Sequence, residues 1–200
     1  MFSMPKSAPA QLTGPVVAVL ARIGVTPNML TVGQLAGGVG AAALIAGGEL
    51  VWGGVAMLAA ALLDAFDGAL ARATGKATRF GGVFDSVVDR LFEGAIFAGI
   101  LYHLIEQGEK TDSMLVLVAA VGSISVSYVR ARAEAAGVAL LEGFFTRPVR
   151  LGLIVLALVI DQLTVVLWIL AVMTIFTTLQ RLAIVWVKLR AEERDGQAGV

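Results

Sequence analysis

Long apolar stretches separated by short polar segments run along most of this chain of 200 residues. A helix that crosses a membrane needs about 20 mainly apolar residues, and most of these stretches reach that length. The predicted helices cover residues 28–47, 51–72, 83–106, 113–136, 145–160 and 163–189, of which the fifth is short. The pattern therefore predicts an all-α, polytopic membrane protein built as a six-transmembrane-helix bundle.

The apolar run at residues 151–179 allows two interpretations, because only Asp161 and Gln162 interrupt it. One continuous helix would split the basic residues of this region between the two faces of the membrane. Two crossings would instead put them all on one side, which the positive-inside rule favours. The residues concerned are Arg147, Arg150, Arg181, Lys188 and Arg190. We therefore predict two helices with a break between them.

With six crossings, the charges of the chain are strongly polarised across the membrane. Both termini and the loops at 73–82 and 137–146 then share one side, which carries all 15 Lys and Arg residues except Lys110. The positive-inside rule makes that side the cytoplasm. We expect a multi-pass protein of the cytoplasmic membrane with its termini and active site facing the cytoplasm. The net charge of zero gives no indication of nucleic-acid binding.

The composition agrees with a membrane domain that carries only short appendages. Hydrophobic residues make up 58% of the chain and the mean hydropathy is +0.87, above the usual range of soluble domains. We predict a tail and juxtamembrane helix at 1–27, the membrane domain at 28–190 and a flexible cytoplasmic tail at 191–200. The apolar stretch 15–23 is too short to cross and is expected to lie along the interface. The absence of cysteine excludes disulfides and thiolate metal sites.

Acidic residues stand out against this apolar background, and they come in two pairs. The aspartates are Asp64, Asp67, Asp85 and Asp89. Spacings of three and four place each pair on one face of a helix, so two adjacent helices would bring the carboxylates together. Carboxylates at membrane depth are costly and mark functional sites. A cluster of them requires cations, and an all-oxygen set suits Mg²⁺ or Mn²⁺. The sequence therefore predicts a metal site.

Around these aspartates the chain matches a longer motif at every position. It reads Asp64-x2-Asp67-Gly68-x2-Ala71-Arg72-x8-Gly81-x3-Asp85-x3-Asp89. This pattern resembles the signature of the CDP-alcohol phosphotransferase family of integral membrane enzymes, and the resemblance covers residues 26–188. The segments 127–134, 147–150 and 180–182 are similar to the actinobacterial branch that makes phosphatidylinositol phosphate.

The resemblance implies roles for individual residues. It makes the four aspartates metal ligands and Asp89 also the general base. It places the CDP moiety of CDP-diacylglycerol against Gly68, Arg72 and Thr78, with Asn28, Met29, Leu30 and Thr31 at its border. A second metal ion about 4 Å from the first is common in phosphoryl displacement. Homodimers are an expectation from the family, which the glycine-rich helices permit.

A second, basic group of residues goes beyond what binding of CDP requires. It consists of Arg130, Arg132, Arg147, Arg150 and Arg181. Guanidinium groups suit a phosphate dianion, which points to a phosphorylated acceptor alcohol. The resemblance favours Arg130, Arg150 and Arg181 as ligands of the acceptor phosphate, with Ser127 nearby. One position departs from the family, because that branch typically has lysine where Arg130 stands. Glu134, four residues after Arg130, is expected either to pair with it or to fix the orientation of the basic pocket.

The function predicted from these features is transfer of a phosphatidyl group from CDP-diacylglycerol to inositol phosphate, with release of CMP. Two alternatives stay open at this stage. The same chemistry with glycerol 3-phosphate would yield phosphatidylglycerol phosphate. A divalent-cation transporter could use the aspartates as its permeation site, but no acidic or polar chain continues across the outer halves of the predicted helices.

Overall fold

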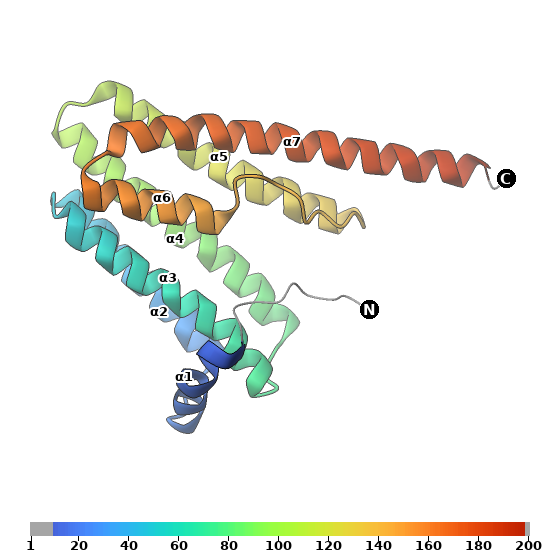
Figure 1. The fold of residues 1–200 in the computed structure, drawn as a ribbon, viewed down its shortest axis with the longest axis horizontal. Coiled ribbons are helices and arrows are strands. Elements are labelled where there is room, and N and C mark those ends of the chain that lie inside the picture. The colour runs from blue at the N-terminus through green and yellow to red at the C-terminus, as the bar shows by residue number, and fades with distance from the viewer. Residues whose placement is uncertain (1–9, 199–200) are drawn as a thin grey trace. The chain divides into compact units, whose positions relative to one another are not determined.

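The computed structural model describes residues 10–198, which form helices joined by short connections and contain no strand (Figure 1). The helices are α1 (Ala10–Arg22), α2 (Pro27–Ala46), α3 (Leu50–Ala73), α4 (Arg79–Glu106), α5 (Lys110–Ala135), α6 (Arg147–Ile160) and α7 (Leu163–Ala198). They belong to two compact units, residues 1–103 and 104–200. Residues 1–9 and 199–200, which include the ends of both predicted tails, lie outside the described part.

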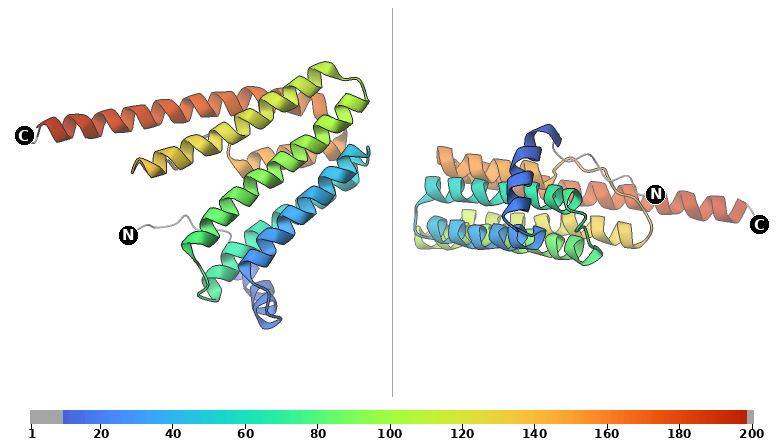
Figure 2. Two further views of the ribbon diagram at one scale, coloured as in Figure 1. Left: turned by 180° about the vertical axis from the view of Figure 1, so that it is seen from behind. Right: turned by 90° about the horizontal axis from the view of Figure 1, so that it is seen from below.

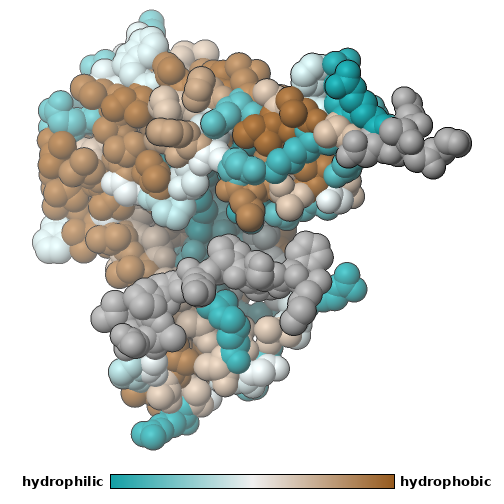
Figure 3. All heavy atoms as spheres, turned by 45° about the vertical axis from the view of Figure 1, so that its right-hand side comes forward, coloured by the Kyte–Doolittle hydropathy of each residue, from teal (hydrophilic) through white to brown (hydrophobic). Residues whose placement is uncertain are grey.

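Four of these helices are long and apolar enough to cross a membrane: α2, α3, α5 and the part Leu163–Arg194 of α7. α6, with 14 residues, is shorter than a full crossing requires. The beginning of α4 carries several charged residues, Asp85, Asp89 and Arg90 among them. Large apolar side chains such as Trp52 and Val121 are exposed, and hydrophobic surface extends over broad areas in Figure 3. This exposure is typical of a surface that faces lipid.

In the first unit, α2 packs closely against α3 and α4 at positions that lack side chains. A β-carbon added at Gly37 would lie 2.9 Å from the Ala60 β-carbon of α3, and one at Gly53 would lie 2.4 Å from an Ile45 side-chain atom. At Gly99 of α4, an added β-carbon would lie 2.5 Å from the carbonyl oxygen of Ala42. Small residues thus allow the backbones to approach, as expected in membrane bundles.

α1 runs across the direction of α2 and α3 (Figure 2). Its Val17 is buried in an apolar cluster with Leu30 of α2 and Leu70 of α3. Thr26 then caps α2, where its side chain accepts a hydrogen bond from the Met29 N–H, and Pro27 occupies the first turn. The helix predicted before the first crossing therefore exists, and its placement at the membrane surface stays a prediction.

In the second unit, α7 packs against both α5 and α6. A β-carbon at Gly122 of α5 would lie 2.0 Å from the Thr174 hydroxyl of α7, so only glycine allows this approach. α6 ends at Ile160 because Asp161 adopts the left-handed conformation, with φ at 54°. α7 begins at Leu163, so the predicted break is confirmed and a single long helix is excluded. α7 continues through Ala198 and includes most of the predicted flexible tail, whose mobility stays a prediction.

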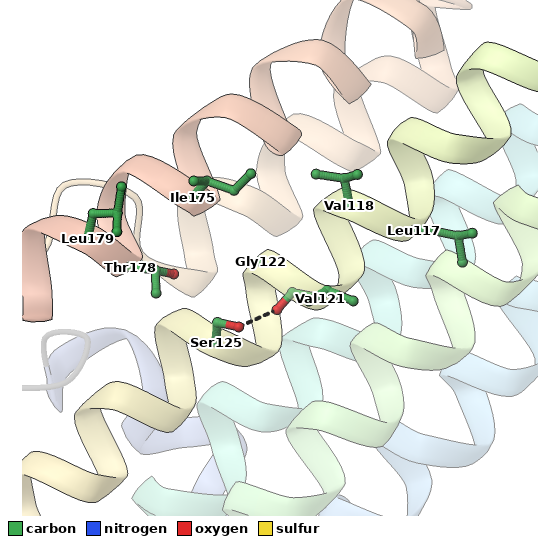
Figure 4. Close-up of a pocket in the computed structure, with 8 residues that line it drawn as sticks. All are labelled: Leu117, Val118, Val121, Gly122, Ser125, Ile175, Thr178 and Leu179. Carbon is green, nitrogen blue, oxygen red and sulfur yellow. Dashed lines mark hydrogen bonds between the residues drawn. The ribbon is translucent and has the colours of Figure 1, made fainter.

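An open groove of about 340 Å³ lies between α5 and α7 (Figure 4). Leu117, Val118, Val121, Gly122, Ser125, Ile175, Thr178 and Leu179 line it. Its two side-chain hydroxyls are engaged by their own helices: Ser125 donates to the Val121 carbonyl and Thr178 to the Thr174 carbonyl, both at 2.8 Å. The groove carries no charged or titratable group, so the chemistry must lie elsewhere.

Candidate active site

Three of the four predicted aspartates meet in the first unit. Asp64 and Asp67 come from the last turns of α3 and Asp85 from the second turn of α4. One carboxylate oxygen of each lies within 4.8 Å of the others. Asp67 is buried, whereas Asp64 and Asp85 are partly exposed. Three carboxylates this close repel one another when ionised, and an oxygen-only donor set suits a hard divalent cation. The geometry thus fits the predicted metal site.

Asp89 lies outside this group of three, one helical turn beyond Asp85 on α4. Its side chain is 14% exposed, and its Oδ2 atom lies 3.9 Å from Nη1 of Arg90. At this distance the pair is at the outer limit of a salt bridge.

α2 contributes two hydrogen bonds to the acidic residues. The Thr31 hydroxyl donates to Asp67 Oδ2 at 2.8 Å, and the Gln34 amide Nε2 donates to Asp89 Oδ1 at 3.3 Å. Both donors are buried. The sequence analysis placed Thr31 at the border of the CDP moiety and did not single out Gln34. The available signal was the polar spacing of Asn28, Thr31 and Gln34, which lie three residues apart on an otherwise apolar helix.

Three of the residues predicted to bind CDP lie where α3 ends and α4 begins. Gly68 and Arg72 belong to the last turns of α3, and Thr78 directly precedes α4. The Arg72 guanidinium folds back over Gly68, with Nη1 3.3 Å from where a β-carbon of residue 68 would stand. The Thr78 hydroxyl accepts a hydrogen bond of 2.9 Å from the Gly81 N–H and so caps α4.

In α2, the predicted CDP-border residues differ in exposure. Asn28 and Met29 are exposed, whereas Leu30 belongs to the apolar cluster with Val17. Their contact with CDP stays a prediction.

Three of the predicted acceptor residues form an arginine cluster in the second unit, namely Arg130, Arg150 and Arg181. The charges of Arg130 and Arg150 act on Arg181. Arg150 and Arg181 are buried, while Arg130 is exposed. Positive charges gathered in this way are costly unless an anion or polar groups compensate them. Ser127, one turn before Arg130 on α5, is partly exposed.

Part of this compensation comes from backbone carbonyls and from Glu134. Arg181 donates to the carbonyl oxygens of Val126 at 2.7 Å and Glu142 at 3.1 Å. Arg150 donates to the Phe145 carbonyl at 3.2 Å. Arg130 forms the predicted ion pair with Glu134, with Nε 2.9 Å from Oε1. The two buried arginines therefore hold the segment between α5 and α6 in place, a structural role that sequence analysis did not predict.

Comparison with known proteins assigns the chain to a family. The family model of the CDP-alcohol phosphatidyltransferases matches residues 24–190. The chain therefore belongs to the CDP-alcohol phosphatidyltransferase family and is an enzyme of that class. It is 39% identical over 182 residues to the phosphatidylinositol phosphate synthase of Mycobacteroides abscessus, an alignment that covers 86% of this chain and 83% of the relative.

Solved structures show the same similarity. The crystal structure of the Mycobacterium tuberculosis phosphatidylinositol phosphate synthase with CDP-diacylglycerol bound matches with a TM-score of 0.83 and 34% identity, covering 88% of this chain and 94% of that one. A second structure of that enzyme, in complex with manganese and citrate, matches with a TM-score of 0.82 and 34% identity, covering 87% and 88%. A divalent metal site in this chain agrees with these findings.

Proposed function

We propose that this protein transfers the phosphatidyl group of CDP-diacylglycerol to inositol phosphate, forming phosphatidylinositol phosphate and CMP. The observation that carries the proposal is the arginine cluster, in which the charges of Arg130 and Arg150 act on Arg181 and which exceeds what the CDP moiety requires. Guanidinium groups bind a phosphate dianion with paired, charge-assisted hydrogen bonds. The names of the similar enzymes support inositol phosphate as the alcohol that carries this phosphate.

Asp64, Asp67 and Asp85, together with Asp89, would hold Mg²⁺ or Mn²⁺, and we propose two ions. When bound, these ions supply neutralisation of the pyrophosphate and of the charge that develops on the departing CMP. Thr31 fixes the orientation of Asp67 through its hydrogen bond. Arg72, folded over Gly68, is placed to donate to a phosphate oxygen.

The transfer itself is a direct displacement at the β-phosphorus of CDP-diacylglycerol. The acceptor hydroxyl forms the new O–P bond as the bond to CMP breaks, and Asp89 takes the hydroxyl proton. The chain has no cysteine and a single histidine, and the displacement needs no covalent intermediate on the enzyme.

Two alternatives differ from this proposal, one in the acceptor alcohol and one in the kind of function. Glycerol 3-phosphate carries a phosphate of the same kind, so the arginine cluster by itself would accept either alcohol. The names of the similar enzymes favour inositol phosphate. Membership of a transferase family gives no support to a divalent-cation transporter.

The arrangement in the membrane belongs to the same proposal. We infer six crossings by α2 to α7, with α4 and α6 completing the bundle beside the four clearly apolar helices. The termini and active site would then face the cytoplasm, and the enzyme would act as a homodimer. The polarised distribution of lysine and arginine supports this orientation.

The deciding experiment offers purified enzyme CDP-diacylglycerol together with one acceptor at a time: inositol phosphate, glycerol 3-phosphate, inositol or serine. We expect CMP release and a phosphatidylinositol phosphate product only with inositol phosphate, and dependence on Mg²⁺ or Mn²⁺. Equal use of unphosphorylated inositol would show that the arginine cluster does not select a phosphate. Metal flux into vesicles without CMP release would indicate a transporter instead.

A further inference from the structure

We propose that Gln34 is a positioning residue that fixes the orientation of the Asp89 carboxylate. The inference rests on the proposed function, in which Asp89 takes the proton of the acceptor hydroxyl. Gln34 belongs to α2 and Asp89 to α4, 55 positions apart in sequence, and the amide Nε2 donates to Asp89 Oδ1 at 3.3 Å. Since the acceptor is a carboxylate, the amide must turn its N–H₂ group toward it.

Gln34 is a polar residue in a fully buried position, which is unusual. It is completely buried, in a helix whose other buried residues include Leu30, Ala41 and Ile45. An amide buried at such a position is unfavourable unless its polar atoms are engaged. Its Oε1 atom has no hydrogen-bond partner among the described residues, so the Gln34 side chain serves Asp89 through its amide nitrogen alone. An apolar residue of the same volume would avoid this cost.

The neighbouring donor Thr31 contacts a different carboxylate from the one that Gln34 contacts. It lies one turn earlier on the same face of α2 and donates to Asp67, which belongs to the group of three metal-site carboxylates. α2 thus presents two donors to two different carboxylates. Thr31 supports a metal ligand, and Gln34 supports the proton acceptor. Groups that orient a functional side chain in this way commonly contribute about 10–100-fold to activity.

The inference can be tested with substitutions that keep volume and remove the donor. Gln34→Met should lower kcat about 10–100-fold at saturating metal, while KM for CDP-diacylglycerol and the melting temperature stay near wild type. Thr31→Val should instead weaken Mn²⁺ binding. Ile45→Met, a fully buried apolar position of the same helix, controls for packing and should change none of these quantities.

A double-mutant cycle decides whether Gln34 acts through Asp89. In the Asp89→Asn background, adding Gln34→Met should lower the residual rate by less than twofold, because the group that Gln34 orients is already lost. A full additional decrease in that background would overturn the proposal, as would a wild-type kcat in Gln34→Met.

The cycle is run with whichever acceptor the wild type uses, so it does not depend on inositol phosphate as the substrate. A wild type that uses a different acceptor would overturn the proposed substrate and leave the cycle decisive for Gln34. A fall in melting temperature that parallels the loss of rate in Gln34→Met would assign Gln34 a purely structural role and overturn the inference.

Discussion

At the scale of single residues, the acidic cluster separates into parts with different surroundings. Asp64, Asp67 and Asp85 approach one another closely, whereas Asp89 stands apart with Gln34 as a donor. We propose that Asp64, Asp67 and Asp85 mainly hold cations, whereas Asp89 also accepts a proton. This division can be tested because the two losses respond differently to added metal.

We predict that Asp64→Ala lowers activity but recovers part of it in excess Mg²⁺ or Mn²⁺, because a lost ligand weakens metal binding. Asp89→Asn should lower the rate by roughly 10²–10⁴-fold without recovery, since it removes a base. Metal titrations of initial rates, with CDP-diacylglycerol binding as a check on folding, measure both effects. Equal rescue of the two variants would contradict the division of roles.

The arginine cluster combines binding and structural roles, and Arg130 offers the clearest test of binding. It is exposed and pairs only with Glu134 in the contacts described above, so its loss should cost little stability. Arg130→Ala should lower kcat/KM for the phosphorylated acceptor about tenfold, as expected for a charge-assisted contact of roughly 1.5 kcal/mol. KM for CDP-diacylglycerol should not change.

Arg132→Ala, an exposed neighbour on α5, is the matched control. Arg181→Ala is less informative because it also removes donors to the Val126 and Glu142 carbonyls. If Arg130→Ala and Arg132→Ala weaken both substrates alike, the acceptor role of Arg130 is wrong.

At the scale of helices, close packing depends on individual glycines whose neighbours are backbone atoms. Gly99 of α4 is the clearest case, because Ala42 of α2 leaves no space for a methyl group. Gly94 of the same helix has nothing within 4 Å of the corresponding position. Substitutions at Gly99 and Gly94 therefore separate the effect of helix packing from the effect of glycine on helix formation.

We predict that Gly99→Ala destabilises the enzyme by about 1–3 kcal/mol, because α2 and α4 must move apart. Gly94→Ala should be neutral or stabilising by roughly 0.5–1 kcal/mol, since alanine favours helices. Thermal unfolding in detergent compares the two variants. A similar melting temperature for both would show that α2 and α4 are not packed as described.

The segment between α5 and α6 is held on α7 by a small set of polar contacts. Lys188 Nζ lies 2.8 Å from Glu142 Oε1 and donates to the Ala139 carbonyl at 2.9 Å. The hydrogen bond from Lys188 lowers the pKa of the Glu142 carboxyl below its ordinary value of 4.5. A lowered pKa means that this contact is fully present above pH 4.5 and is lost as the pH falls through the value in the folded state.

We therefore expect hydrogen-exchange protection of residues 137–146 to decrease only at pH values below 4.5 in the wild type. Glu142→Gln should show reduced protection already at neutral pH and no further change in the acidic range. Protection factors corrected for intrinsic exchange rates measure the difference. An identical pH dependence in wild type and variant would show that another group controls the segment.

At the scale of the whole molecule, the open question is topology. The absence of cysteine makes the natural chain a suitable background for single-cysteine labelling. Gln107 lies between α4 and α5, and Ala77 lies between α3 and α4; both are exposed. Six crossings with cytoplasmic termini place these two positions on opposite sides of the membrane.

A membrane-impermeant maleimide should therefore label Gln107→Cys in intact cells and label Ala77→Cys only after the membrane is permeabilised. Both variants should retain CMP release, which confirms that labelling reports the native fold. Labelling of both positions in intact cells would exclude an odd number of crossings between them and refute the single crossing proposed for α4.

Much of the fold was predictable because its signals are local. The predicted membrane helices agree within a few residues with α2, α3, α5 and α6 and with the start of α7, since apolar length defines a helix in a membrane. α7 continues nine residues beyond the predicted end at residue 189. The helix over residues 83–106 was predicted to begin later than α4 does. Its polar first turn, capped by Thr78, is defined by hydrogen bonding rather than by hydrophobicity.

The family, the reaction class and the residue pairs within one helix could be predicted from the amino-acid sequence alone. Helical spacing predicts that two pairs of side chains lie on the same helix face, because it depends only on neighbouring positions. These pairs are Asp64 with Asp67 and Arg130 with Glu134. The carboxylate that each α2 donor serves, and the carbonyls that Arg181 contacts, became known only from the packing of the helices. Those contacts join residues 36 and 55 positions apart, and their partners are chosen by how the helices pack rather than by any local pattern.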